Sequence, residues 1–199
     1  MPSSPSALKI EASGNFQALL AQQRMSLLVS TYQAGKLMVL RADQGKLNVH
    51  FRSFTKAMGV AANRARLAVG TAVHVHELYN MPAVGAKLEP PHRHDACYVL
   101  RNSHVTGDID IHEMAWAGDE LWFVNTRFSC LCTLDRAYSF VPRWRPPFVS
   151  AYAAEDRCHL NGLAMVEDQP RYVSALGQSD RAQGWRENKA SGGLIMELE

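Results

Sequence analysis

The stretch CHLNGLAMVEDQPRYVSALG, residues 158–177, decides the fold because two earlier stretches of the chain follow the same pattern. It holds a small apolar segment, a polar turn and a second apolar segment, which is the pattern of a β-hairpin. The earlier copies are KAMGVAANRARLAVG (56–70) and DIHEMAWAGDELWFVN (110–125). The chain therefore contains an internal repeat of strand, turn and strand.

The spacing of the repeat predicts the architecture. When the three copies are aligned on Ala61, Ala115 and Ala164, the two intervals are 54 and 49 residues. An interval of about 50 residues leaves room for four strands, which is typical of a β-propeller blade. We therefore predict an all-β fold, a partial or incomplete β-propeller of about three to four blades of antiparallel strands. A β-sandwich is the alternative.

The N-terminal part of the chain changes character twice. Residues 1–14 are rich in Pro, Ser and Ala and predict a flexible lead-in, whereas residues 15–24 place apolar side chains on one face of a short N-terminal helix. Alternating apolar residues and glycine-containing turns then predict three strands within residues 26–54. We therefore expect a single propeller-like domain over residues 15–199.

The overall charge excludes some partners. The chain carries 21 Lys and Arg against 19 Asp and Glu, a formal net charge of +2, so we expect neither nucleic acid nor a membrane surface as a partner. No apolar stretch is long enough to span a bilayer, and the N-terminus lacks the pattern of a secretory signal. We therefore expect a cytoplasmic protein whose four cysteines are reduced thiols.

The densest group of chemically active side chains lies in PPHRHDACYVLRNSHVTGDIDIHE, residues 90–113. Within it Asp108, Asp110 and His112 alternate, so on a strand they would share one face. Carboxylates and imidazoles that converge can bind a divalent metal, and we predict these three residues and Asn161 as its ligands. Hydrogen bonds between blades, or a solvated loop, are the alternative reading of the cluster.

A related set follows from the alignment. The residue three places before each aligned alanine is Met58, His112 or Asn161, so we expect these side chains at the mouth of a central channel. We predict His112, Glu113 and Asn161 as ligand-binding residues there. The segment NGLA is similar to the Asn-Gly-Ile/Leu-Ala motif of calcium-dependent lactonase propellers, and this resemblance implies a metal-ligating Asn161. It also implies carboxylate ligands from other blades, for which Glu113 and Asp180 are the nearest candidates. A plain structural Asn-Gly turn is the alternative.

The segment RWRPPF, residues 143–148, is cationic, aromatic and stiffened by two prolines. Arg143, Trp144 and Arg145 could grip an acidic partner or peptide, and we include them among the predicted ligand-binding residues. Alternatively the segment is a connection between blades, with Trp144 packed between two sheets.

A family resemblance is carried by five stretches, which are STYQAGKL (30–37), HVTGDIDIHEMA (104–115), FVNTRFSCL (123–131), WRPPFVSAYAAEDRCHLNGLAM (144–165) and GWRENKASGG (184–193). Together they resemble an uncharacterised bacterial family, known only as a conserved hypothetical protein or domain of unknown function. The resemblance implies propeller-like repeats that continue past residue 199, and it implies no activity. We therefore expect a C-terminally shortened member, with exposed sheet edges through which copies self-associate.

These observations predict three functions in order of preference. The first is a non-catalytic propeller module that binds a small-molecule ligand or a protein partner through its loop face. The second is a metal-dependent, lactonase-like hydrolase that uses the same channel mouth and a divalent metal. The third is an inactive, shortened remnant.

Overall fold

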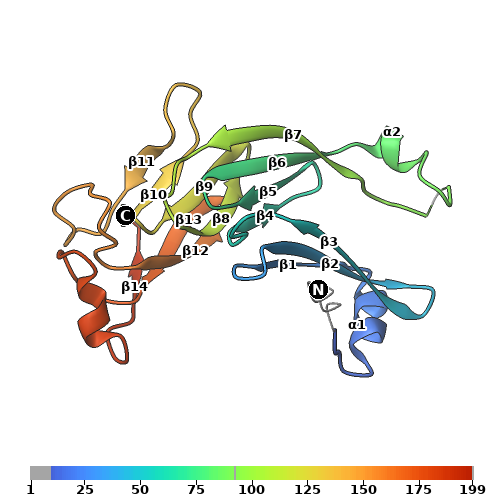
Figure 1. Ribbon diagram of the computed structural model, residues 1–199, viewed down its shortest axis with the longest axis horizontal. Coiled ribbons are helices and arrows are strands. Elements are labelled where there is room, and N and C mark those ends of the chain that lie inside the picture. Colours follow the sequence, from blue (N-terminus) through green and yellow to red (C-terminus); the bar gives the residue numbers. More distant parts are fainter. Residues whose placement is uncertain (1–9, 92, 199) are drawn as a thin grey trace, which may run out of the picture.

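Four antiparallel sheets follow one another along the chain in the computed structural model, which describes residues 10–91 and 93–198 (Figure 1). The helices are α1 (Phe16–Gln23), α2 (Pro82–Gly85) and the 3-10 helix η1 (Gly184–Asn188). The first sheet contains β1 (Leu27–Thr31), β2 (Lys36–Asp43) and β3 (Lys46–Ser53). The second contains β4 (Val60–Ala62), β5 (Arg66–Gly70), β6 (His74–Asn80) and β7 (Tyr98–Val105). The third contains β8 (Ile111–Ala117), β9 (Glu120–Asn125), β10 (Cys130–Thr133) and β11 (Val141–Trp144). The fourth contains β12 (Leu160–Val166), β13 (Gln169–Ala175) and β14 (Leu194–Glu197).

Apolar side chains fill the space between each pair of consecutive sheets. Because a sheet buries the apolar residues of one face against a neighbour, the order of the clusters reports the order of the sheets. The three buried clusters each hold residues of two sheets, for example Leu37 with Val69, Ala68 with Phe123, and Leu131 with Val173. The sheets therefore pack first on second, second on third, and third on fourth.

Hydrogen bonds between side chains and backbone reinforce the same order. The Trp116 indole donates to the Ala61 carbonyl at 3.3 Å, and the Thr126 hydroxyl donates to the Leu160 carbonyl at 2.6 Å. A third bond, from the Ser30 hydroxyl to the Met58 carbonyl, joins the first two sheets. Each junction between sheets therefore has a specific polar link in addition to its apolar contacts.

The backbone of the second sheet approaches β8 very closely. A Cβ atom added at Gly70 would lie 2.8 Å from Cγ2 of Ile111, and one at Gly59 would lie 2.7 Å from Cγ of Met114. Any side chain at either glycine would displace these buried residues. The two glycines therefore let β4 and β5 pack directly against the first strand of the third sheet.

The three aligned alanines lie on the first strands of the second, third and fourth sheets, and β8 contacts both β4 and β12. The residue five places before each alanine has a left-handed backbone conformation: φ is 54° at Lys56, 57° at Asp110 and 51° at His159. Such angles are uncommon for residues other than glycine. Their recurrence at one alignment position shows that the repeat extends to the turn that precedes each first strand.

The fold agrees with the predicted class, a mostly β structure with a partial, propeller-like arrangement of four sheets. The predicted short helix is α1, and the three strands predicted within residues 26–54 are β1, β2 and β3. Residues 1–9 of the predicted lead-in, and His92 of the polar cluster, lie outside the described residues. No helix within residues 10–91 and 93–198 is long and apolar enough to cross a membrane.

Candidate functional site

Four connecting segments meet at one end of the sheets, which we call the loop end. The Arg127 amide donates to the Ile109 carbonyl at 3.1 Å, and the Asp156 amide donates to the Arg127 carbonyl at 2.8 Å. The Gln183 amide donates to the Glu155 carbonyl at 3.0 Å. These backbone bonds connect all four segments, which are residues 106–110, 126–129, 145–159 and 176–193.

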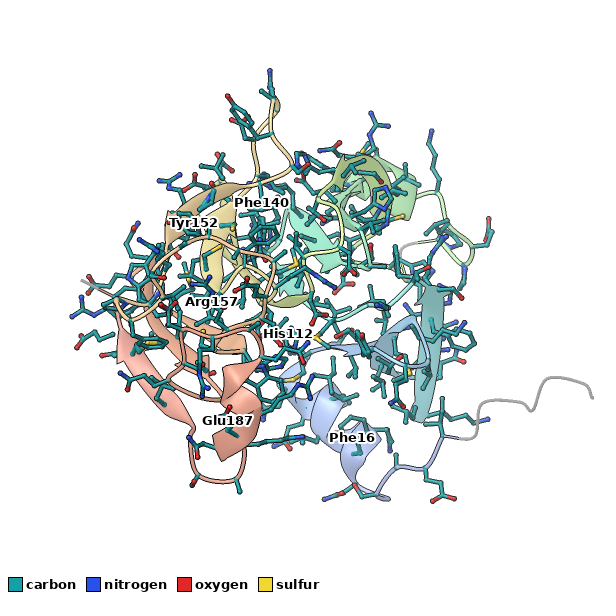
Figure 2. All side chains as sticks on the ribbon, turned by 60° about the vertical axis from the view of Figure 1, so that its left-hand side comes forward. Phe16, His112, Phe140, Tyr152, Arg157 and Glu187 are labelled. Carbon is teal, nitrogen blue, oxygen red and sulfur yellow. The ribbon has the colours of Figure 1, made fainter. Side chains whose placement is uncertain are left out.

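His112, at the start of β8, is held in one tautomer by its neighbours. Its Nδ1 lies 3.0 Å from the Asp110 carbonyl oxygen, which can only accept, and 2.8 Å from the Thr126 hydroxyl. That hydroxyl already donates its proton to Leu160 and therefore accepts from the imidazole. Both contacts place the proton on Nδ1. Figure 2 shows His112 near the middle of the molecule, with strands of all four sheets around it in that view.

His159, which immediately precedes β12, lies against His112, with ring centroids 4.8 Å apart and an angle of 83° between the planes. Its Nδ1 lies 2.9 and 3.1 Å from the two carboxylate oxygens of Asp156. The same carboxylate accepts a bond of 3.0 Å from the Trp185 indole, whose ring packs on His159 at 4.4 Å. A carboxylate and an aromatic ring from two different loops thus fix His159.

The two imidazoles, which we call the histidine pair, both form their hydrogen bonds through Nδ1. Each directs its Nδ1 proton to an oxygen acceptor, so Nε2 of the neutral ring carries a lone pair. Within the described residues, neither Nε2 has a hydrogen-bond partner. The pair therefore has two adjacent ring nitrogens whose acceptor capacity no group within the described residues uses.

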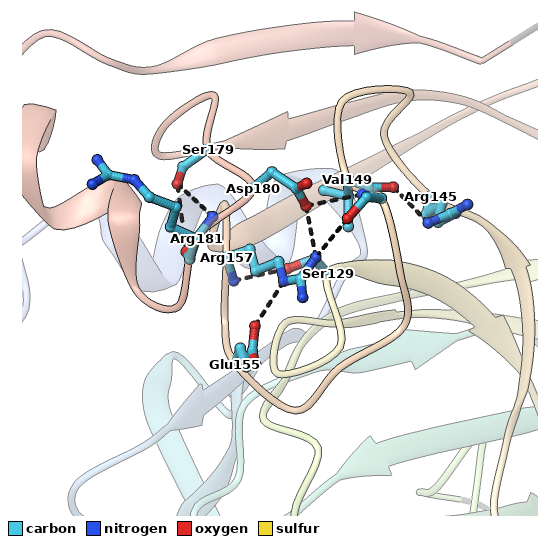
Figure 3. A network of polar contacts seen from close by, with 9 residues as sticks. Ser129, Arg145, Val149, Glu155, Arg157, Ser179, Asp180 and Arg181 are labelled. Carbon is cyan, nitrogen blue, oxygen red and sulfur yellow. Dashed lines mark hydrogen bonds and ion pairs between the residues drawn. The ribbon is translucent and has the colours of Figure 1, made fainter.

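A network centred on Arg157 holds the neighbouring loops together (Figure 3). Its guanidinium donates to Glu155 at 2.8 Å, to Asp180 at 2.7 Å and to the Ser150 hydroxyl at 3.1 Å. Its amide donates to the Ser129 hydroxyl at 3.0 Å. The Arg157 side chain is only 13% exposed, so its ion pairs are screened less than ordinary surface pairs.

The network shifts the pKa values of its members. The pKa of Asp180 lies below its usual 3.8, first because the Ser150 amide and hydroxyl donate to the carboxylate and then because Arg157 lies beside it. The pKa of Arg157 is raised, first by its bond to Glu155 and then by its bond to Asp180. Both shifts favour the ionised forms, so the network is stable over the neutral pH range.

A cleft of about 570 Å³ lies next to the histidine pair; Asp110 and Asp156, which bond the two rings, line it, but neither ring does. Three of its lining residues have positive φ, namely Asp110 (57°), Asp156 (49°) and Gln183 (51°). Strained backbone of this kind persists where the surrounding structure enforces it, and it is concentrated at functional sites. The polar residues of the lining are Asp110, Arg127, Glu155, Asp156, Gln183 and Arg186.

The structure places the predicted metal ligands in different settings. Asp108 and Asp110 do not alternate on a strand with His112, because β8 begins only at Ile111 and Asp110 is left-handed; the prediction of a shared strand face was wrong. Asp108 pairs with Arg127 at 2.7 Å, and Asn161 is exposed on β12.

The carboxylates that the lactonase motif requires are also engaged elsewhere. Glu113 accepts the Met114 amide at 3.0 Å, and Asp180 belongs to the Arg157 network. Within the described residues, no three His, Cys, Asp or Glu side chains converge closely enough to hold a metal ion. The donor set in that part of the chain is thus incomplete.

The cationic, aromatic segment is divided between two settings. Arg143 donates to Glu120 at 2.9 Å and lies over the Trp122 ring at 5.1 Å, while Trp144 packs against the apolar cluster between the third and fourth sheets. Arg145 donates to the Val149 carbonyl at 2.6 Å. None of the three lines the cleft beside the histidine pair.

Side chains near the histidine pair that could act as nucleophiles are engaged or protonated. The Thr126 hydroxyl donates to Leu160, and the Ser129 hydroxyl accepts the Arg157 amide. Burial raises the pKa of the Cys158 thiol to about 11, so it is not a thiolate at neutral pH.

Sequence reasoning identified His112 but missed His159, Asp156 and Trp185. A signal for His159 was present, since it occupies the same alignment position as Asp110, five residues before the aligned alanine. No comparable signal pointed to Trp185, because its segment carries neither strand periodicity nor a repeat.

Comparison with known protein families adds one finding. The sequence model described as "Domain of unknown function (DUF4915)" matches residues 14–199. The chain belongs to this family. Membership in DUF4915 assigns no activity, so function must be argued from the loop end. A comparison with curated proteins found no match.

Proposed function

We propose that this DUF4915 protein is a non-catalytic module that binds a small polar ligand at its loop end. The observation that carries the proposal is the histidine pair, whose two Nδ1 atoms are both anchored while both Nε2 lone pairs remain without a partner in the described residues. Anchoring one ring nitrogen orients the other for a ligand, because it fixes both the tautomer and the ring plane.

The surroundings of the pair support binding. The cleft of about 570 Å³ falls in the range of small-molecule sites, and four loops joined by backbone bonds form it. Loops on a rigid sheet scaffold are the usual position of recognition residues. Together the Arg157 network and the Asp156 carboxylate preorganise these loops, which reduces the entropy lost when a ligand binds.

A panel of four compounds tests the proposal by saturation-transfer NMR: glucose, AMP, citrate and L-glutamine. We expect at least one to bind the wild-type chain and to lose its signal with His159→Ala. His50→Ala is the matched control, because His50 is exposed on β3 in the first sheet, and it should bind as the wild type does. Binding that survives His159→Ala, or absence of binding by these four compounds and by the amino acids screened below, would contradict the proposal.

Elemental analysis of the purified chain separates the proposal from the hydrolase alternative. Stoichiometric metal that is lost with both His112→Ala and Asn161→Ala would favour a metal-dependent hydrolase. A metal-free chain that binds a panel compound would favour the ligand-binding module.

A further inference from the structure

The charges in the cleft beside the histidine pair are unevenly compensated. Of its five charged residues, Arg127 pairs with Asp108 at 2.7 Å and Glu155 pairs with Arg157 at 2.8 Å. Asp156 accepts from both His159 and Trp185. Each of these three residues therefore has an ionic or hydrogen-bonding partner within the protein, although the buried Nε of Arg127 has none in the described residues.

The remaining two charged groups have opposite signs and no charged partner. In the part of the chain that the structure describes, the Asp110 carboxylate makes no hydrogen bond or ion pair. The Arg186 guanidinium donates only through Nε, to the Gln183 amide oxygen at 3.0 Å, and lies over the Trp185 ring at 4.4 Å. One anion and one cation thus line the same cleft, each with unused hydrogen-bonding capacity.

Neighbouring residues position both Asp110 and Arg186. The left-handed backbone of Asp110 is tied to His112 through its carbonyl, and Gln183, also left-handed, orients Arg186. Stacking on Trp185 further restricts the guanidinium. The Arg186 guanidinium is thus already restricted and loses less entropy on binding, whereas Asp110 is placed by its backbone turn alone.

We infer that the cleft takes a small zwitterion, a free amino acid by chemical class, with its ammonium group at Asp110 and its carboxylate at Arg186. The inference rests on the proposed function and specifies its ligand. A ligand with one charge leaves either Asp110 or Arg186 without a counterion, whereas a zwitterion satisfies both with charge-assisted hydrogen bonds. Arginine is the side chain best matched to a carboxylate, because its fork can bind both oxygens.

The first part of the test identifies the best ligand and its charge requirement. The twenty common L-amino acids are screened against the full chain by saturation-transfer NMR, and the best is measured by calorimetry. Its analogues that lack either the ammonium or the carboxylate group are measured in parallel. We expect each analogue to bind about 10- to 100-fold more weakly, the effect of losing hydrogen bonds to a charged group.

The second part assigns each charge to a residue. Asp110→Asn should remove the preference for the amino acid over its analogue without an ammonium group. Arg186→Gln should remove the preference over the analogue without a carboxylate. Arg181→Gln is the matched control, because Arg181 lies in the same loop, pairs with Glu187 and does not line the cleft; it should preserve both preferences.

The outcomes separate the inference from the proposed function. Failure of every amino acid to bind, or equal affinity for a singly charged analogue, would overturn the zwitterion. If glucose, AMP or citrate then binds in a manner sensitive to His159→Ala, the proposed function stands and only the ligand class is wrong. If no compound of either set binds, both are wrong.

Discussion

The loop end differs in its charged contacts from the opposite end of the sheets, where β8 turns into β9 and β12 into β13 and which we call the hairpin end. At the hairpin end, Arg66 pairs with Asp119 and Arg143 with Glu120, and all but the Arg66 side chain are well exposed. At the loop end, Arg157 and His159 are 13% and 16% exposed, and Arg157 joins two carboxylates, 43% and 38% exposed, with a hydroxyl. An isolated exposed ion pair contributes little and tolerates change, whereas the members of a connected network depend on one another. The contrast indicates that precise geometry is concentrated at the loop end.

The largest expected effect is the loss of Trp185, which is only 4% exposed and supports both Asp156 and His159. Trp185→Ala should reduce the free energy of unfolding by about 3 to 5 kcal/mol, measured by urea denaturation. Trp122→Ala at the hairpin end is the comparison, and because Trp122 is only half-buried it should cost about 1 to 2 kcal/mol. Equal costs at the two ends would refute the contrast.

The second-largest effect is expected on the backbone hydrogen bonds that join the loops. Arg157→Ala should accelerate hydrogen exchange at the amides of Asp156 and Gln183 by about tenfold or more, because the backbone bonds between loops would open more often. Amides within β9 should exchange as in the wild type. Exchange that rises equally throughout the chain would indicate global destabilisation, and the network would then have no special role in the loops.

The Arg157 network also predicts a pH dependence. Because the pKa of Asp180 is lower in the folded chain than its usual 3.8, the ionised carboxylate stabilises the fold above about pH 4. This stability is lost as the pH falls through the lower, folded pKa. Asp180→Asn should therefore lower the urea midpoint at pH 6, and this effect should shrink progressively as the pH falls from about 4 through the lower, folded pKa. A difference that stays constant over this whole pH range would rule out this electrostatic origin.

The smallest effect is expected at the hairpin end. Arg143→Ala removes an ion pair whose two side chains are 42% and 44% exposed, so the free energy of unfolding should change by about 0.5 kcal/mol or less. Ligand binding at the loop end should be unaffected. A loss of binding would show that the segment containing Arg143 takes part in recognition after all.

The scaffold was predictable because its signals are local and repeated. Alternating apolar residues and a recurring alanine located β4, β8 and β12, and the same spacing predicted four sheets at most. The site was predictable only in part. His112 was found from its alignment position, but its partners come from loops whose approach depends on tertiary packing.

Two details show why local patterns are insufficient. Asp108, Asp110 and His112 have the spacing of a strand face, yet the chain makes a left-handed turn at Asp110 that no alternation rule anticipates. Trp185 contacts His159 at a sequence separation of 26 residues, and nothing near either residue in the sequence specifies that distance. Such contacts are set by the packing of the third and fourth sheets.

The recurrent left-handed turn before the first strands carries a different type of side chain in each of three sheets. Lys56, Asp110 and His159 place an ammonium, a carboxylate and an imidazole at equivalent points before three adjacent strands. The same backbone turn thus forms with three chemically different side chains, so the turn itself does not depend on the chemistry of the residue that makes it. Side chains of different charge can therefore precede the first strands of three sheets while the strands themselves keep one arrangement.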